Sequence, residues 1–209
     1  MANILDIFKK SIKQKTQEQE GKLMEFDLDN VKIVKLDKQT AELLESQSHL
    51  ESLSLVECSL KTLEGFPKLP NLQNLVLETN QLDGEAIKFI GNTYPKLLCL
   101  SLAENQIKTF ADLEPIKQLK KLQQLDLSEN PIAKLPGYFQ KVFDLVPGLS
   151  VLDNKDKSGN DIQYSEDEDE LVVDDSEDSE NEIDDEDDGL DDDDDDEESS
   201  PKPTKKAKQ

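Results

Sequence analysis

One eleven-residue pattern recurs along most of this chain and constrains its fold more than any other feature. The pattern LxxLxLxxN/CxL is met five times, as LMEFDLDN from Leu23, LESLSLVECSL from Leu50, LQNLVLETNQL from Leu72, LLCLSLAENQI from Leu97 and LQQLDLSENPI from Leu122. The starts lie 27, 22, 25 and 25 residues apart, and a shorter LSVLD begins at Leu149, 27 residues further on. Repeats of roughly 20 to 29 residues with this pattern each supply one unit of a stacked solenoid.

This pattern is that of the leucine-rich repeat. It predicts an α/β solenoid shaped as a horseshoe, with a parallel sheet on its concave face and stretches of helical spacing, such as GEAIKFIGNTYPKL, on the convex side. Asn80, Asn105 and Asn130, with Cys58 in the second repeat, occupy the position whose side chain satisfies backbone groups of the turn. Asn30 is offset by one residue, so we expect the first repeat to be irregular.

We expect three regions along the chain. Residues 1–22 form an N-terminal helical cap, because Ile4, Leu5, Phe8 and Ile12 make one apolar stripe; binding of a membrane or a partner helix is the alternative use of that stripe. Residues 23–153 form the repeats and a C-terminal cap, YFQKVFDLVPGLSVLD. Residues 154–209 form a disordered acidic tail, because so few apolar residues cannot bury enough surface to offset chain entropy.

Charge is distributed very unevenly. The 209 residues carry a formal charge of −24 and no arginine, and residues 166–198 alone hold 24 acids and no base, whereas residues 1–165 hold 24 acids and 20 lysines. The acidic segment carries about one charge per 5 Å when extended, against about one per 1.7 Å along duplex DNA. Such a segment can hold a basic protein and release it to DNA, as a histone chaperone does, and direct DNA binding is not expected. A purely solubilising segment is the alternative.

Strand positions that alternate with the inward leucines should line the concave face. The candidate partner-binding residues there are Glu25, Asp27, Asn74, Val76, Leu98, Cys99, Ser101, Gln124 and Asp126. None of these is a lysine, which predicts a groove for a basic or amphipathic partner, with Val76, Leu98 and Cys99 as its apolar centre. The alternative is that small polar side chains only keep a solvated sheet soluble.

The C-terminal end carries a short basic cluster and several serines. Lys205, Lys206 and Lys208 fit the K-K-x-K pattern read by an import receptor, which predicts a nuclear protein, with shuttling to the cytoplasm as a further expectation. Folding back of these lysines onto the acids is the alternative. Candidate phosphorylation sites, each with an acid three residues later, are Ser158, Ser165 and Ser179. Two glycine-containing acidic stretches lack the Glu at position twelve that an EF-hand requires.

No pattern predicts an enzyme, a cofactor or a metal site. The single histidine, His49, has no acid placed to orient it, and the sequence has no glycine-rich phosphate loop. Cys58 and Cys99 lie two repeats apart, roughly 10 Å at ~4.8 Å per strand, so we expect two free thiols in a reducing compartment. No apolar run is long enough to cross a bilayer and no signal peptide is evident, so we expect a soluble protein that is not secreted and does not bind membranes. A monomer is a separate expectation.

Five features of the chain occur together: the five repeats, the cap YFQKVFDLVPGLSVLD, the stretch LEPIKQLKKLQQLDL, the Asp/Glu tail and the terminal basic cluster. In these features the chain resembles the acidic leucine-rich nuclear phosphoproteins (the LANP/mapmodulin family) over essentially its whole length. This resemblance implies a nuclear, non-enzymatic protein that binds core histones, restrains their acetylation and regulates chromatin and transcription. In some members it implies inhibition of a serine/threonine protein phosphatase, for which the concave face would serve without the whole tail. A splicing-type scaffold is a third hypothesis, because a spliceosomal leucine-rich-repeat protein shares the cap, but the acidic tail disfavours a role facing RNA.

Overall fold

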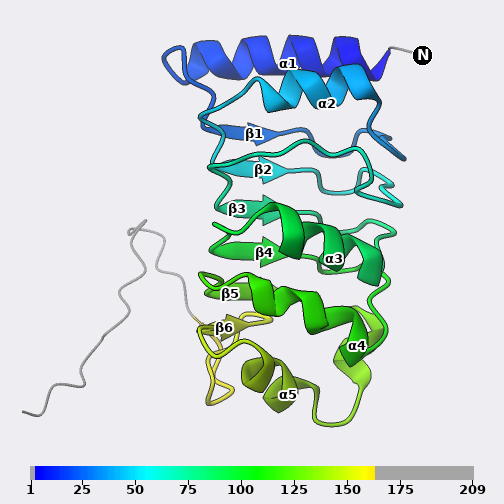
Figure 1. Cartoon of the computed structure of the whole chain (residues 1–209), viewed down its shortest axis with the longest axis vertical. Helices are drawn as coiled ribbons and strands as arrows, with labels where there is room; N and C mark the ends of the chain where they lie inside the picture. The colour runs from blue at the N-terminus through cyan, green and yellow to red at the C-terminus, as the bar shows by residue number, and fades with distance from the viewer. Residues whose placement is uncertain (1–2, 163–209) are drawn as a thin grey trace, which may run out of the picture. The chain divides into compact units, whose positions relative to one another are not determined.

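The computed structural model describes residues 3–162, which form an open solenoid of parallel strands (Figure 1). Six strands stack in chain order into one sheet: β1 (Glu25–Asp27), β2 (Ser52–Ser54), β3 (Asn74–Val76), β4 (Cys99–Ser101), β5 (Gln124–Asp126) and β6 (Val151–Leu152). The central apolar residues of the strands pair in one continuous row from Phe26 to Leu152. The predicted horseshoe architecture with a parallel sheet is therefore confirmed.

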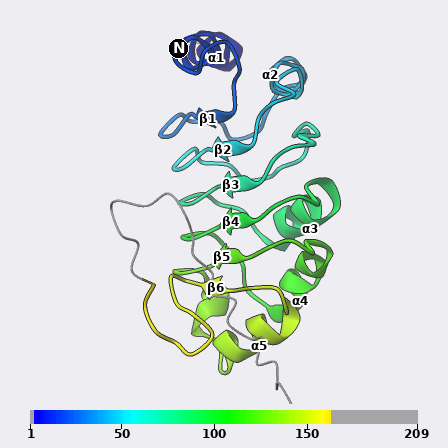
Figure 2. The same cartoon turned by 90° about the vertical axis from the view of Figure 1, so that its left-hand side faces the viewer.

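Helices close the N-terminal end and cover one side of the sheet. They are α1 (Ile4–Glu18), α2 (Lys38–Glu45), α3 (Gly84–Thr93), α4 (Phe110–Leu113) and α5 (Tyr138–Leu145), with 3-10 helices η1 (Glu114–Gln118) and η2 (Pro131–Lys134). In Figure 2, α2, α3 and α4 lie on the same side of the strand column, which is the convex side. The N-cap residues of α2, α3 and α4 are Asp37, Asp83 and Thr109, whose side chains each accept a hydrogen bond from a backbone N–H of the first turn.

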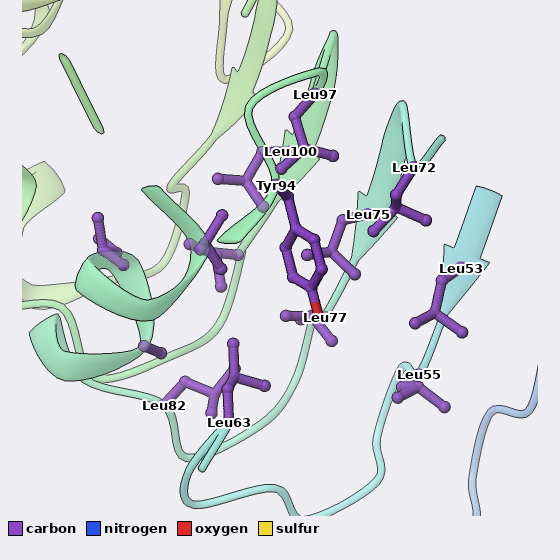
Figure 3. Packing of buried hydrophobic residues seen from close by; sticks show 14 of the residues in the cluster. Leu53, Leu55, Leu63, Leu72, Leu75, Leu77, Leu82, Tyr94, Leu97 and Leu100 are labelled. Carbon is purple, nitrogen blue, oxygen red and sulfur yellow. The ribbon is translucent and has the colours of Figure 1, made fainter. Parts of the chain in front are cut away.

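The core lies between the sheet and the convex layer, and stacked leucines dominate it. Leu53, Leu75 and Leu100 occupy equivalent positions on successive strands and are buried (Figure 3). Tyr94, just after α3, is also buried, and its hydroxyl donates to the carbonyl oxygen of Pro67 at 2.9 Å. Burial raises the pKa of this hydroxyl above its usual range. Because equivalent leucines stack from strand to strand, each repeat packs its leucines against those of the neighbouring repeats.

The buried asparagines link each repeat to the preceding one. The side-chain nitrogen of Asn105 donates to the carbonyl oxygens of Leu77, Leu102 and Ala103, and its oxygen accepts from the N–H of Leu82. Asn130 makes the equivalent set of bonds, and Asn80 makes the same set with one more, from the N–H of Cys58. The predicted role of these side chains in the turns is confirmed.

The second and first repeats depart from this arrangement in different ways. Cys58 takes the asparagine position, and its thiol donates to the carbonyl oxygen of Leu28 at 3.2 Å, as an amide would. In the first repeat Val31 stands at this position, one residue after Asn30, so the predicted irregularity is confirmed. A valine side chain cannot donate, so this repeat lacks the bond.

The residue before each of these positions has a left-handed backbone conformation. The values of φ are +61° at Asn30, +55° at Glu57, +54° at Thr79, +53° at Glu104 and +54° at Glu129. In this conformation the N–H of Thr79 reaches the carbonyl oxygen of Ala103 in the next repeat at 3.0 Å. The first four repeats therefore each gain a hydrogen bond to the next repeat, and this bond offsets about 1–2 kcal/mol of backbone strain in a non-glycine residue.

The free edge of β1 is paired by a single side chain. Gln19, which ends α1, accepts hydrogen bonds on its Oε1 from the N–H groups of Met24 (2.7 Å) and Glu25 (3.0 Å), and its Nε2 donates to the carbonyl oxygen of Glu25 (2.7 Å). In the next repeat the equivalent N–H groups, of Glu51 and Ser52, both bind the carbonyl oxygen of Met24. The Gln19 amide therefore replaces the carbonyl of a missing preceding repeat, while Phe8 of α1 packs on the ring of β1's Phe26.

The chain turns back on itself after β6. Leu152 forms an antiparallel bridge with Lys155, which in turn pairs with Asp161. The start of the disordered tail at residue 154 was therefore predicted too early, because residues 154–162 still pair in the structure. The physical reason is that an edge strand needs partners for its backbone groups, a demand that low hydrophobicity does not reveal. The rest of the predicted tail, residues 163–209, lies outside the described residues.

A carboxylate beside the last turn joins the C-terminal cap to the sheet. The two oxygens of Asp153 accept from the N–H of Leu127 (2.8 Å) and the hydroxyl of Tyr138 in α5 (2.9 Å). Burial raises the pKa of the Asp153 carboxyl above its usual range, and nearby Asp126 adds to the increase. The predicted C-terminal cap is thus fixed to the repeats by polar as well as apolar contacts.

Candidate partner-binding face

The outward residues of the strands form two columns on the concave face. By strand register, one column holds Glu25, Ser52, Asn74, Cys99 and Gln124, and the other holds Asp27, Ser54, Val76, Ser101 and Asp126. All of the predicted partner-binding residues except Leu98 belong to these columns. Leu98 lies one residue before β4 and is half-buried. The structure thus brings the candidates onto one surface.

The N-terminal part of this face carries a lysine that sequence reasoning did not place there. Lys15 of α1 reaches the carboxylate of Asp27 in β1, with 2.6 Å between Nζ and Oδ1. The hydrogen bond from Lys15 to Asp27 raises the pKa of Lys15. Neighbouring Asp29 accepts from the Ser54 hydroxyl (2.8 Å) and the N–H of Val56 (2.7 Å). Asp27 therefore already has a cationic partner from its own chain.

The C-terminal part of the face is hollowed. A shallow depression of about 200 Å³ lies over β3 to β6. Its lining consists of Leu75, Val76, Glu78, Cys99, Leu100, Ser101, Gln124, Leu125, Asp126, Val151 and Asn154. Five of the predicted residues thus share one hollow, whereas Glu25, Asp27, Asn74 and Leu98 lie outside it. The hollow also includes Val151 and Asn154, which belong to the closing half-repeat and follow no complete pattern.

Two carboxylates in this hollow are held in place by serine hydroxyls. Ser101 donates to Oε1 of Glu78 at 2.7 Å. Ser128 donates to Oδ1 of Asp126 through both its hydroxyl (2.6 Å) and its N–H (2.8 Å). Between residues 3 and 162, neither Glu78 nor Asp126 belongs to an ion pair. This end of the face therefore presents negative charge without a lysine partner from the described part of the chain.

The two rims of the sheet differ in charge. Glu57, Glu104 and Glu129 lie at the equivalent position after β2, β4 and β5, whereas Lys96 and Lys121 are exposed just before the repeats of β4 and β5. Because parallel strands all end at the same edge, the glutamates gather on one rim and the lysines on the other. Sequence reasoning missed this acidic rim, although the shared repeat position of the glutamates could have revealed it.

The remaining predicted sites lie apart from this face. Ser158 is exposed in the loop after β6, where its N–H donates to the carboxylate of Asp156 at 2.8 Å, and hydrogen bonds from Asn160 lower the pKa of that carboxyl. Cys58 is buried, Cys99 is half-buried, and both are free thiols, as predicted. The other candidates, Ser165, Ser179, Lys205, Lys206 and Lys208, lie outside the described residues.

Residues 3–162 contain no group of three or more His, Cys, Asp or Glu side chains arranged to hold a metal ion. Within the same residues, no helix has both the length and the apolar character needed to span a membrane.

The repeats, their register and the inter-repeat asparagines define the class of this protein. A family model described as leucine-rich repeat matches residues 5–170, and the chain belongs to that family. More particularly, the chain is similar to acidic leucine-rich nuclear phosphoprotein 32 family member A of Drosophila melanogaster, with 35% identity over 148 residues, which cover 71% of this chain and 54% of that relative. The resemblance to the acidic leucine-rich nuclear phosphoproteins is thereby confirmed.

Two further comparisons found similar proteins with other names. The chain is 33% identical over 132 residues to a Tetrahymena thermophila protein named histone H2A.Y, covering 63% of this chain and 34% of that relative. A chain in the crystal structure of the Drosophila melanogaster SNF/U2A' complex superposes with a TM-score of 0.54 at 27% identity, covering 63% of this chain and 73% of that one. The chain spans about half the length of the nuclear phosphoprotein relative from Drosophila melanogaster.

Proposed function

We propose that this protein is a nuclear, non-enzymatic histone-binding protein that acts as a histone chaperone and chromatin regulator and restrains histone acetylation. The observation that carries the proposal is the charge of the concave face, where Glu78 and Asp126 have no lysine partner within residues 3–162. The sequence adds 24 acids between residues 166 and 198. The names of the relatives, nuclear phosphoproteins and a histone, point to the same compartment and partner.

The two acidic parts would contribute differently to binding. Many charges close together in the sequence attract a basic protein over a Debye length of about 8 Å at physiological salt, with little selectivity. Carboxylates held by hydrogen bonds on a rigid sheet recognise a particular arrangement of cations. We infer that the acidic segment supplies most of the affinity, whereas the concave face supplies specificity.

The test is binding of purified core histones to the full chain and to residues 1–165. That shorter chain retains the whole described core and both caps. The full chain is expected to bind histones, residues 1–165 to bind them more weakly, and both complexes to weaken with salt and with competing duplex DNA. Absence of histone binding by both chains would overturn the proposal. Undiminished inhibition of a serine/threonine protein phosphatase by residues 1–165 would then favour the alternative function.

We further propose that Lys205, Lys206 and Lys208 direct nuclear import. A tagged full chain in which all three lysines are replaced by alanine should be lost from nuclei. Replacing Lys9, Lys10 and Lys13 of the N-terminal region by alanine makes the same change in charge and serves as the control. Unchanged nuclear accumulation of the C-terminal variant would contradict the proposal.

A further inference from the structure

The hollow over β3 to β6 combines negative charge and apolar surface in an ordered way. Apart from the buried leucines of the strands, its apolar side chains are Val76, Cys99 and Val151. By register, Cys99 and Val151 lie in the column nearer the starts of the strands. Asp126 lies two residues further along β5, and Glu78 lies two residues beyond Val76. Val76 shares the second column with Ser101 and Asp126. The hollow is therefore apolar toward the starts of the strands, over Cys99 and Val151, and carries its two carboxylates toward the strand ends, with Val76 beside them.

The dimensions suit one extended side chain. Cys99 and Ser101 are two residues apart on β4, a rise of about 7 Å along the strand, which is comparable with the length of a lysine or arginine stem. Glu78 and Asp126 belong to the repeats on either side of β4. A stem lying along β4 over Cys99 would therefore bring its charged end to Ser101, between two carboxylates.

The acidic end is already organised for such a ligand. The hydroxyl of Ser101 donates to one oxygen of Glu78 and holds it in place. The hydroxyl and the N–H of Ser128 both donate to one oxygen of Asp126. Side chains that are ordered before binding lose little conformational entropy when a ligand arrives. Asp126 lies close enough to Asp153 to raise the pKa of Asp153, so a cation at this end would also relieve repulsion between carboxylates.

The two ends of the concave face are not equivalent in this respect. At the N-terminal end, Lys15 already occupies the carboxylate of Asp27. At the C-terminal end, the described residues supply no cation to Glu78 or Asp126. Glu25 of β1 also belongs to no ion pair within residues 3–162, but it stands alone there, whereas Glu78 and Asp126 lie on either side of β4.

From this geometry we propose that the hollow is a seat for a single lysine or arginine side chain of an extended basic peptide. Its stem lies over Cys99 and its charged end lies between Glu78 and Asp126. That the partner is basic rests on the proposed function. The inference itself places recognition of the partner on the repeats, and this recognition does not depend on the acidic segment.

The experiment follows backbone amide signals of the isotope-labelled full chain by NMR during titration with a nine-residue Gly/Ser peptide that contains one central lysine. The same peptide with norleucine in place of lysine keeps the stem and removes the charge. At about 0.15 M salt, the lysine peptide should shift the amides of Ser101, Gln124 and Asn154, whereas the norleucine peptide should not.

The variant that tests the seat is E78Q/D126N. Both substitutions keep the oxygen that accepts from serine, so the fold should be retained, and thermal unfolding would verify this. Each lost charge pair at a partly exposed site should weaken binding about three-fold, so the double variant should bind the lysine peptide about ten-fold more weakly. The matched control is E57Q/E129Q, which removes the same charge from the acidic rim and should change the affinity less than about two-fold.

The outcomes separate this inference from the proposed function. Equal weakening in the two variants, or amide shifts that avoid the hollow, would show that only the general negative field attracts the lysine, and the seat would be wrong even if histones bind the full chain. A peptide that binds as expected, with no binding of histones, would uphold the seat and overturn the proposed function. If deletion of residues 201–209 shifts the same amides before any peptide is added, the chain's own lysines fill the hollow, and the assignment to a separate partner is wrong.

Discussion

Replacing the buried asparagines by alanine should destabilise the protein in an order that the hydrogen bonds determine. In Asn105→Ala, the carbonyl oxygens of Leu77 and Leu102 lose one donor but keep another, because Leu77 still accepts from Asn80 and Leu102 still accepts from Asn130. The N–H of Leu82 has only the Asn105 oxygen as an acceptor among the described residues. This substitution therefore leaves one buried donor unpaired.

Asn80→Ala leaves two donors unpaired, because the Asn80 oxygen accepts from the N–H groups of both Cys58 (3.1 Å) and Leu60 (2.9 Å). A buried unpaired donor costs about 1–3 kcal/mol, and each lost bond to a carbonyl that keeps another donor costs less. The free energy of unfolding should therefore fall by about 2–4 kcal/mol in Asn105→Ala and by about 4–6 kcal/mol in Asn80→Ala.

Urea denaturation followed by circular dichroism measures both values. Asn92→Ala is the control. Within residues 3–162, the side chain of this exposed asparagine of α3 bonds only to the carbonyl oxygen of Lys88, so its removal should change stability by less than about 0.5 kcal/mol. The reasoning fails if Asn80→Ala costs no more than Asn105→Ala. It also fails if both cost less than about 1 kcal/mol, since unpaired buried donors would then not govern the stability of these variants.

Three further predictions follow from single positions. Gln19→Ala should lower the free energy of unfolding by about 1–2 kcal/mol, and hydrogen exchange at the amide of Glu25 should become faster; unchanged exchange would contradict edge capping by Gln19. Thr79→Asn should raise the free energy of unfolding by about 0.5–1 kcal/mol, because asparagine tolerates the left-handed backbone conformation of this residue. Asn30 already adopts that conformation at the equivalent position of the first repeat. A lower stability of the variant in urea would contradict this prediction. Burial raises the pKa of Asp153 in the folded state above its value in the unfolded state. The free energy of unfolding, compared with that of Asp153→Asn, should therefore fall as pH rises from about 4 through the raised pKa. Denaturation curves of both proteins at several pH values measure this difference, and the opposite slope would refute the prediction.

The strands could be predicted because their signal is local. The leucines of each LxL, such as Leu53 and Leu55, are buried in the structure, and their neighbours face outward as alternation requires. The observed register joins equivalent positions of the aligned repeats, Leu53 with Leu75 and Leu75 with Leu100. The paired residues 154–162 could not be predicted in this way, because Lys155 and Asp161 are polar and carry no periodic signal.

The candidate face could be predicted as a set of positions but not as a site. Strand alternation gave Val76, Cys99 and Asp126, yet the hollow is completed by Val151 from a half-repeat without the full pattern. The partner of Asp27 is Lys15, a residue of the N-terminal helix whose contact with β1 depends on how that helix docks. Contacts between elements, rather than residue types, thus determine which carboxylates remain free.

The position of Gln19 also limits extension of the solenoid at its N-terminal edge. The Gln19 amide already binds the N–H groups of Met24 and Glu25 and the carbonyl oxygen of Glu25, so pairing of this edge with a strand from another chain would first have to displace that side chain. The same contact affects how the protein could change over evolution. A duplicated repeat could be inserted between two existing repeats, because its backbone carbonyls would pair with the next repeat as those of the original repeat do. It could not be added before β1 unless the capping glutamine also moved to the new first strand.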